Sequence, residues 1–211
     1  MLAPPRCAVC GASCPASAAA CARCLAAVAP RRAGSGRVGE LRVVWGAVYE
    51  GRARELVAAL KFHGRLDLAR LAGGVVAATA AGAGLDCGRA VVPVPAAPLR
   101  LRRRGFDPGE LIAAAVAGEL GLPLVPCLAR RSGRRQVGRD RAARLVDPPR
   151  VRLAGKPPRA ALLVDDVLTT GATLGSCAAV LRRAGCPNVA AGVFARTLDV
   201  ATSEAYDLTQ R

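Results

Sequence analysis

The chain has 211 residues, 52% of them hydrophobic, so it can form the core of one α/β domain of ordinary size and carry a small appended module. It contains three Phe, two Tyr and one Trp, which argues against a nucleic-acid platform built from a row of stacked aromatic side chains. It has no apolar run of about 18 residues, and its N-terminus lacks a basic region followed by an apolar segment, so we expect neither a membrane span nor a signal peptide.

The formal net charge is +16, from 31 basic and 15 acidic residues, and nearly every basic residue is arginine. Such a surplus suits polyanionic partners, either a phosphorylated substrate or nucleic acid, although a solvated basic surface would give the same composition. Nine cysteines in a chain without a signal peptide indicate a reducing compartment, so we expect a cytoplasmic protein. The sequence carries no signature of the oligomeric state.

Residues 1–30 form a separate predicted module, because five of the nine cysteines lie within residues 7–24. Two Cys-x-x-Cys pairs separated by ten residues are typical of a structural, tetrahedral zinc site with four thiolate ligands. The segment has few bulky apolar side chains, so metal binding would supply its folding energy. A redox dithiol is the alternative, but it normally lies at a strand–helix junction, which is missing here. The predicted ligands are Cys7, Cys10, Cys21 and Cys24, with Cys14 as a spare thiol.

Residues 31–40 are rich in Pro, Gly and Arg, which predicts a linker to a larger domain over residues 41–200, with a tail over 201–211. In this domain, predicted strands alternate with predicted helices, which favours an α/β fold with a doubly wound parallel sheet and a ligand at the carboxyl ends of its strands. The strands are predicted at 41–48, 90–95, 151–153, 160–164 and 188–195, and the helices at 51–64, 65–81, 107–120 and from 174 onward.

Lys61 lies near the end of the first predicted helix of this domain, and Lys156 is the one other lysine of the chain. In a sequence that otherwise uses arginine, a retained lysine indicates a need for a compact ammonium group. A chance exposed lysine is the alternative interpretation. We interpret His63, the single histidine, as a surface or capping residue rather than as a catalyst.

The strand over 90–95 runs into a turn fixed by proline, and four arginines in five residues follow it. Guanidinium groups match the oxygen pairs of phosphates, so this stretch is a candidate pyrophosphate loop, with a solvated basic loop as the alternative. Asp107 is the predicted N-cap of the next helix, and Pro108 is its first residue. The candidate pyrophosphate residues are Val94, Pro95, Arg102, Arg103 and Arg104.

Residues 130–146 contain seven arginines and few apolar side chains, so this segment cannot pack a core. We predict a mobile, arginine-rich loop that closes over a nearby phosphate site as a lid.

The most informative stretch is 162–174, where a buried strand leads into Asp165 and Asp166, then into a loop of hydroxyls and glycine, and then into an amphipathic helix. Amide groups and the dipole at the start of a helix favour a phosphate, and the two acids can accept hydrogen bonds from the hydroxyls of a ribose. A ribose 5-phosphate is therefore the predicted ligand. The alternatives are a strand capped by acids or a metal-binding acidic pair. The predicted phosphate-binding residues are Thr169, Thr170, Gly171, Ala172 and Thr173.

This stretch resembles the phosphoribosyl pyrophosphate (PRPP) signature of type I phosphoribosyltransferases. In order along the chain, five further features resemble the ComF family, which includes competence-associated proteins. These features are the four-cysteine ribbon, Leu60-Lys61-Phe62-x-Gly64, Val92-Pro93-Val94-Pro95, Arg104-Gly105-Phe106 and a flexible loop with Arg131, Gln136 and Arg144.

The resemblance implies a type I phosphoribosyltransferase-like sheet that binds PRPP with Mg²⁺ and transfers ribose 5-phosphate to an unknown acceptor. It also implies an alternative, a non-catalytic accessory protein of DNA uptake that binds nucleic acid or competence-machinery proteins. Asp107 and Pro108 stand where the family usually has Asn-Gln, and Gly133 stands where its loop commonly has Thr. These departures affect the acceptor side of the site more than the PRPP side.

Overall fold

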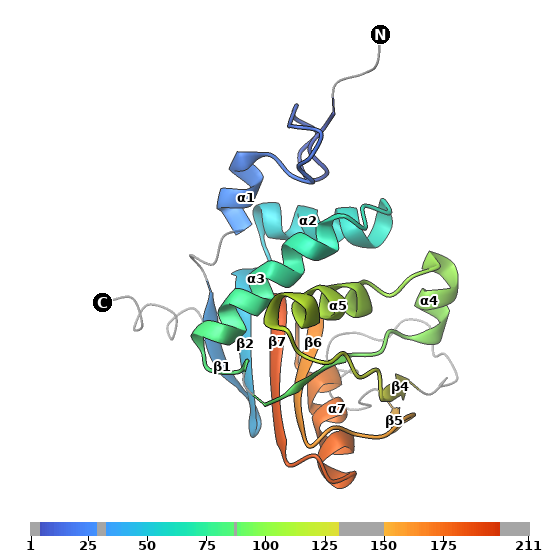
Figure 1. Cartoon of the computed structure of the whole chain (residues 1–211). Coiled ribbons are helices and arrows are strands. Elements are labelled where there is room, and N and C mark those ends of the chain that lie inside the picture. The colour runs from blue at the N-terminus through green and yellow to red at the C-terminus, as the bar shows by residue number, and fades with distance from the viewer. Residues whose placement is uncertain (1–4, 29–32, 87, 131–149, 199–211) are drawn as a thin grey trace.

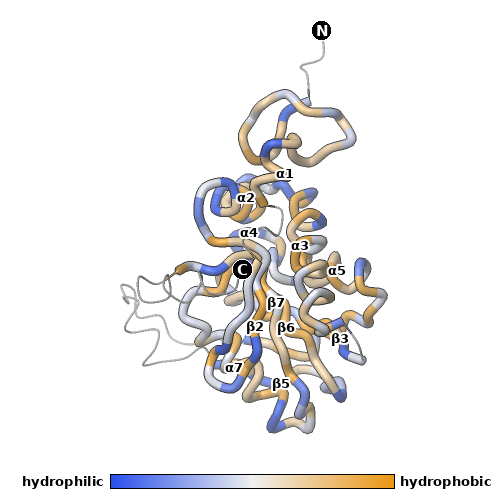
Figure 2. Tube along the Cα trace, turned by 90° about the vertical axis from the view of Figure 1, so that its left-hand side faces the viewer, coloured by the Kyte–Doolittle hydropathy of each residue, from blue (hydrophilic) through white to orange (hydrophobic). Residues whose placement is uncertain are grey.

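In the computed structural model, a five-stranded sheet forms the centre of the molecule, and the structure describes residues 5–28, 33–86, 88–130 and 150–198. The strand order is β1-β2-β7-β6-β3 (Figures 1 and 2). Four strands run parallel, and β1 pairs with β2 in the antiparallel sense. The predicted α/β class is confirmed, but the sheet is mixed rather than wholly parallel. Its strands are β1 (Gly34–Val38), β2 (Leu41–Val48), β3 (Ala90–Pro93), β6 (Ala160–Leu168) and β7 (Asn188–Arg196).

Helices cover both faces of the sheet (Figure 1). Helices α2 (Gly51–Phe62), α3 (Leu68–Gly82) and α5 (Pro108–Leu120) lie on one face. Helix α7 (Ala172–Arg183) lies on the other, beside a small hairpin of β4 (Leu128–Arg130) and β5 (Val151–Leu153). The strands over 41–48 and 151–153 form where the sequence predicted them, whereas the helix predicted over 51–64 ends at Phe62, and the helix predicted over 107–120 begins at Pro108 with Asp107 as its N-cap.

The core consists of two apolar clusters, one on each side of the sheet. Strand β6 supplies both, because successive side chains of a strand point to opposite faces. Leu162 and Val164 pack toward α3 and α5, whereas Leu163 packs toward α7. This two-sided burial explains the unbroken apolar run at the start of β6. In Figure 2 the hydrophobic colour is concentrated along the central strands.

Two parts of the chain differ from the sequence prediction. Residues 34–38, assigned to a linker, form edge strand β1, because the chain turns back at Gly39 (φ 56°) and pairs with β2. The glycines there serve packing rather than flexibility, since a Cβ on Gly34 would lie 2.5 Å from Cζ2 of Trp45. Strand β6, predicted over 160–164, extends through both acids to Leu168, and β7 lies between β2 and β6.

The N-terminal module lies against the helical face and includes α1 (Ala22–Val28) (Figure 1). Its buried residues Cys7, Ala20, Cys24 and Val28 belong to the same apolar cluster as α2 and α3. The module is therefore packed on the domain, and residues 5–28 and the sheet share one core. Among the helices in the described ranges, none has both the length and the apolar character needed to cross a membrane.

Candidate functional site

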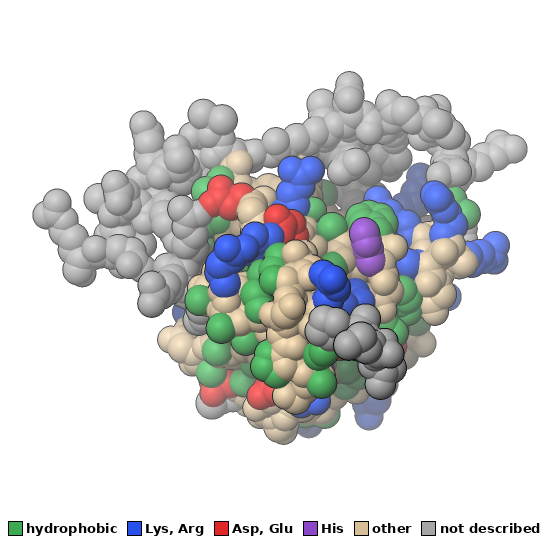
Figure 3. Space-filling view, turned by 90° about the horizontal axis from the view of Figure 1, so that it is seen from above, with side chains coloured by type: hydrophobic (Ala, Val, Ile, Leu, Met, Phe, Trp, Pro, Cys, Tyr) green, Lys and Arg blue, Asp and Glu red, His purple; other side chains and the backbone are tan. Residues whose placement is uncertain are grey.

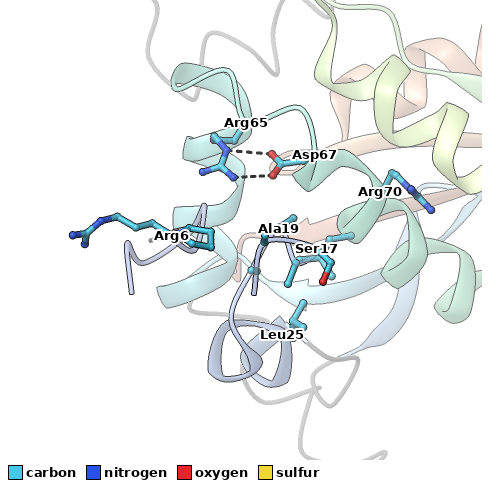
Figure 4. A pocket seen from close by; sticks show the side chains of 12 residues that line it. Arg6, Ser17, Ala19, Leu25, Arg65, Asp67 and Arg70 are labelled. Atoms are coloured by element: carbon cyan, nitrogen blue, oxygen red, sulfur yellow. Dashed lines mark hydrogen bonds and ion pairs between the residues drawn. The ribbon is translucent and has the colours of Figure 1, made fainter. Parts of the chain in front are cut away.

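A hollow of about 900 Å³ lies between the N-terminal module and the start of α3. Figure 4 shows that Arg6 and Arg70 extend away from it, while Arg65 and Asp67 pair with each other. Arg65 Nη2 lies 2.8 Å from Asp67 Oδ2, so both charges are already satisfied. Because its polar side chains do not converge on a common point, this hollow lacks the character of a ligand site.

A second cavity, of about 390 Å³, lies at the carboxyl ends of β3 and β6, where open α/β sheets bind ligands. It brings together groups from α2, α4 (Pro98–Arg104), α5, β4, β6 and α7. The sequence-predicted residues that line it are Lys61, Val94, Pro95, Arg104, Asp165, Asp166, Thr169, Thr170, Ala172 and Thr173. Arg131, Gln136 and Arg144 lie outside the described residues.

Lys61 joins the last turn of α2 to the acidic pair on β6. Its Nζ atom donates a hydrogen bond of 2.6 Å to Asp166 Oδ1, and the two groups form an ion pair. The side chains of Lys61 and Asp166 are only 21% and 12% exposed, so water screens this pair weakly. The sequence indicated a need for an ammonium group at position 61, and the structure identifies the carboxylate that it contacts.

The two neighbouring acids have different surroundings. Part of Asp165 faces the cavity, but the protein atoms around it, and next the negative charge of Asp166, raise the pKa of Asp165 to about 8. The backbone N–H of Asp166, which donates to Asp165 Oδ1 at 2.8 Å, and the Lys61 ammonium oppose this rise. Burial and the charge of its neighbour thus favour the protonated form of Asp165, while Asp166 faces a cation.

The loop that follows β6 leads directly into α7. Gly171 is the N-cap of this helix in a left-handed conformation (φ 75°), which glycine adopts without strain. A Cβ at this position would lie 2.5 Å from Cγ1 of Val38 on β1, so the edge strand also requires glycine here. Thr170 Oγ1 accepts a hydrogen bond from the N–H of Ala172. The start of a helix of 12 residues thus opens on the cavity, an arrangement that favours an anion.

Asp107 lines the cavity and organises the turn after β3. Its Oδ2 atom accepts from the N–H of Ala96 at 2.8 Å, and its Oδ1 atom accepts from the N–H of Gly109 at 2.9 Å. The predicted N-cap is confirmed, and the same carboxylate holds the turn against the start of α5. The sequence did not indicate the contact with Ala96, because it joins two segments through the fold of the turn.

The predicted basic loop is in fact helix α4, and this changes which arginines reach the cavity. Arg100 and Arg104 line it because residues four apart share one face of a helix, whereas Arg102 and Arg103 are absent from its lining. Arg104 also lies over the exposed ring of Phe62, 5.3 Å from its centroid. Of the three predicted pyrophosphate arginines, Arg104 alone is in the lining, and Arg100, which was not among them, joins it.

Tyr49 after β2 and Arg130 at the end of β4 also line the cavity, although neither was named as a candidate site residue. Burial, and next the positive charge of Arg100, lower the pKa of Arg130. No motif surrounds Tyr49, so only the fold brings it to the cavity, whereas Arg130 is the first residue of the segment predicted as an arginine-rich lid. On the face seen from above, Lys and Arg side chains lie in separate groups with acidic side chains among them rather than in one continuous patch (Figure 3).

The sulfur atoms of Cys7, Cys10, Cys21 and Cys24 all lie within 4.8 Å of one another. A tetrahedral zinc with Zn–S bonds of about 2.3 Å requires sulfurs about 3.8 Å apart, and Cys10 and Cys21 lie 3.7 Å apart. Cys14 instead donates to the carbonyl of Ala18, so the four predicted ligands form the cluster without it. In the described part of the chain, this is the group of His, Cys, Asp or Glu side chains that could hold a metal ion.

Backbone amides prepare this cluster for a cation. Burial acts to raise the pKa of Cys7, but the N–H groups of Cys21, Cys10 and Val9 point at its sulfur and lower the pKa to about 6. Thiolates are the form of cysteine that binds metals. The four-cysteine cluster therefore fits a structural zinc site.

No family model matches the chain. The chain is 29% identical over 114 residues to Competence protein F of Haemophilus influenzae (strain ATCC 51907 / DSM 11121 / KW20 / Rd). The alignment covers 51% of this chain and 50% of that protein, so the match spans about half the length of this curated relative. This distant similarity agrees with the resemblance to the ComF family that the order of motifs indicates.

Proposed function

We propose that the cavity binds PRPP with Mg²⁺ and that the protein transfers ribose 5-phosphate to an acceptor, as type I phosphoribosyltransferases do. One observation carries the proposal: an acidic pair and a helix N-terminus that follow one another on the chain face the same cavity at the carboxyl end of the sheet. Hydroxyl acceptors beside an anion site match a ribose 5-phosphate. The cavity of about 390 Å³ lies in the size range of small-ligand sites.

Each part of the substrate has a proposed partner. Residues 169–173 hold the 5-phosphate, and Asp165 and Asp166 hold the ribose hydroxyls. The turn at Val94 to Ala97, together with the lining arginines Arg100, Arg104 and Arg130, faces the diphosphate. Substrate oxygens and water would supply the ligands of Mg²⁺, which often keeps few protein ligands and neutralises diphosphate charge.

In the proposed reaction, the bond between the anomeric carbon and the diphosphate oxygen breaks, and the acceptor nucleophile bonds to that carbon. The diphosphate leaves with the bonding electron pair. The protein needs no covalent intermediate, because its contribution is to position the ribose and to stabilise the charge that develops on the leaving group. The predicted lid residues Arg131, Gln136 and Arg144 stay a prediction.

The test is calorimetric titration of Mg²⁺-PRPP into three purified proteins. The wild type is compared with Arg100→Ala/Arg104→Ala, which removes two lining arginines, and with Arg102→Ala/Arg103→Ala, which removes two arginines of the same helix outside the lining. We expect the first variant to bind at least about ten-fold more weakly and the second to bind like the wild type, since a lost charged contact weakens binding by about that factor. Absence of PRPP binding by the folded wild type would refute the proposal.

A second candidate function is an accessory role in DNA uptake without catalysis, and the similarity to Competence protein F favours it. The net charge of +16 suits contact with phosphates of nucleic acid. This function predicts binding of single-stranded DNA that weakens steeply with salt and is unchanged in Arg100→Ala/Arg104→Ala. Fluorescence anisotropy over a salt series distinguishes the two, because PRPP binding depends on the cavity arginines.

We also propose that the four-cysteine cluster binds one structural Zn²⁺. The close sulfur atoms and the amides directed at Cys7 support it, and four thiolates leave no open position for catalysis.

A further inference from the structure

The contact between Lys61 and Asp166 links residues that are 105 positions apart in the chain, and it lies in the wall of the cavity. Removing two charges from water is unfavourable, so an ion pair with little exposure persists only where its geometry and partners compensate. The hydrogen bond of 2.6 Å is short for an ammonium and a carboxylate, which indicates a tight pair. The position of this ion pair in the cavity wall suggests that it affects ligand binding.

The charges around the acidic pair are unevenly placed. On β6 the two acids are adjacent, and Asp107 of α5 faces them with both oxygens held by backbone N–H groups. Arg100 and Arg104 of α4 and Arg130 of β4 line the cavity, and in the described part of the chain none of them forms an ion pair with either acid. Lys61 of α2 is the cation that touches the pair, and it touches one member only.

We propose that Lys61 is a positioning residue that makes the two acids unequal: its ion pair fixes Asp166 as a hydrogen-bond acceptor, whereas Asp165, which Lys61 does not touch, is left as a group that can also donate. The ribose diol of the proposed substrate would then meet one group that only accepts hydrogen bonds and one that can also donate. This inference rests on the proposed PRPP site for its ligand, but the inequality of the two acids is a property of the free protein.

The local hydrogen bonds fit this division of roles. Asp165 Oδ1 accepts from the N–H of Asp166, which leaves its Oδ2 atom to carry the proton. Two adjacent carboxylates repel each other, which favours a proton on one of them, and the Lys61 ammonium beside Asp166 favours Asp165 as its site. The raised pKa of Asp165, about 8, agrees with this assignment. Each hydroxyl of a diol is both donor and acceptor, so it can pair with either form.

The first experiment follows the side-chain carboxyl carbons of aspartate by NMR in the ligand-free protein labelled with ¹³C-aspartate. Asp165→Asn and Asp166→Asn assign the two signals. We expect one carboxyl, Asp165, to titrate near pH 8, and Lys61→Met to move that midpoint upward by about one pH unit, because a neighbouring positive charge is lost. Lys61→Arg keeps the charge and should keep the midpoint. A wild type in which both acids titrate below about pH 6, or a midpoint unchanged in Lys61→Met, would overturn the proposal.

The second experiment measures the affinity for ribose 5-phosphate by calorimetry at pH 7. Asp166→Asn and Lys61→Met should bind at least about ten-fold more weakly than the wild type, and Asp165→Asn, which keeps a neutral hydrogen-bonding group, should lose less affinity than Asp166→Asn. Equal losses in the two asparagine variants would overturn the inference. If the wild type binds neither ribose 5-phosphate nor PRPP, the proposed function fails, and the NMR titration still decides whether Lys61 makes the acids unequal.

Discussion

The cysteine cluster and the cavity are two sites assembled in different ways. The cluster takes all four sulfurs from residues 7–24, and the spacing of its Cys-x-x-Cys pairs predicts it directly. The cavity takes its groups from positions between 49 and 173 on seven or more segments of the chain. A site whose residues are neighbours in sequence can be predicted from a motif. A site assembled around a sheet can be predicted only in those segments that supply several of its groups.

The two sites also differ in what holds them in place. The cluster has little apolar material of its own beyond Cys7, Ala20, Cys24 and Val28, which pack against the helices of the main domain. The cavity is bounded by strands and helices that belong to the two apolar clusters, one on each side of the sheet. Loss of a metal should therefore disorder the first site and leave the second intact.

The largest expected effect tests this independence. Cys10→Ser removes one ligand, so we expect bound zinc to fall from about one per chain toward zero and the amides of residues 7–24 to lose hydrogen-exchange protection, because metal binding supplies folding energy. PRPP affinity should change less than about three-fold. Atomic absorption, exchange mass spectrometry and calorimetry measure the three quantities. Cys14→Ser is the matched control and should keep the metal; equal metal loss in both variants would contradict the assignment of ligands.

The next effect concerns the loop before α7. Gly171→Ala should destabilise the protein by about 1–3 kcal/mol, because alanine is strained at φ 75° and its Cβ would clash with Val38. Gly175→Ala is the matched control, inside the same helix with open space around it, and should stabilise by about 0.5–1 kcal/mol. Urea unfolding measures both. Similar changes in the two variants would show that the close contact between β1 and the loop is absent.

A smaller effect depends on pH. The pKa of Asp165 in the folded protein, about 8, exceeds its ordinary value of 3.8, so the folded state binds the proton more tightly than the unfolded state. The stability that this proton contributes is complete below about pH 4 and is lost as the pH rises through 8. Asp165→Asn should therefore gain about 1–2 kcal/mol relative to the wild type between pH 5 and pH 9, a value reduced to allow for water in the cavity. Thermal melts at both pH values measure it, and a difference that does not change with pH would contradict the raised pKa.

The smallest effect lies at the rim of the cavity. The side chain of Phe62 is 73% exposed, so its contact with the Arg104 guanidinium should contribute only about 0.5–1 kcal/mol. A double-mutant cycle with Phe62→Leu and Arg104→Met measures this coupling by chemical unfolding. Arg103→Met provides the reference pair with Phe62, for which we expect no coupling. A larger coupling between Phe62 and Arg104 would mean that this contact is shielded from water and would contradict the exposed position of the ring.

The errors of prediction have physical causes that particular residues illustrate. Gly34 and Gly36 resemble linker residues in the sequence, because glycine is common in flexible segments and the ring of Trp45 that needs the space lies on another strand. The arginines of α4 are typical of a loop in the sequence, because the run carries four charges and no buried apolar residue that would show a helical repeat. Asp107 was recognised as a cap, because capping depends on residues close in sequence, but its bond to Ala96 was not.

The sequence by itself determined the α/β class, the four-cysteine cluster, the acidic pair with its glycine-containing loop and the N-cap of α5, because each depends on residue types at short, fixed spacings. Only the tertiary structure decided that β1 joins the sheet, that Arg100 and Arg104 rather than Arg102 and Arg103 line the cavity, and that Lys61 pairs with Asp166. These contacts join positions tens of residues apart, and their geometry comes from strand register and helix packing, which local spacing does not encode.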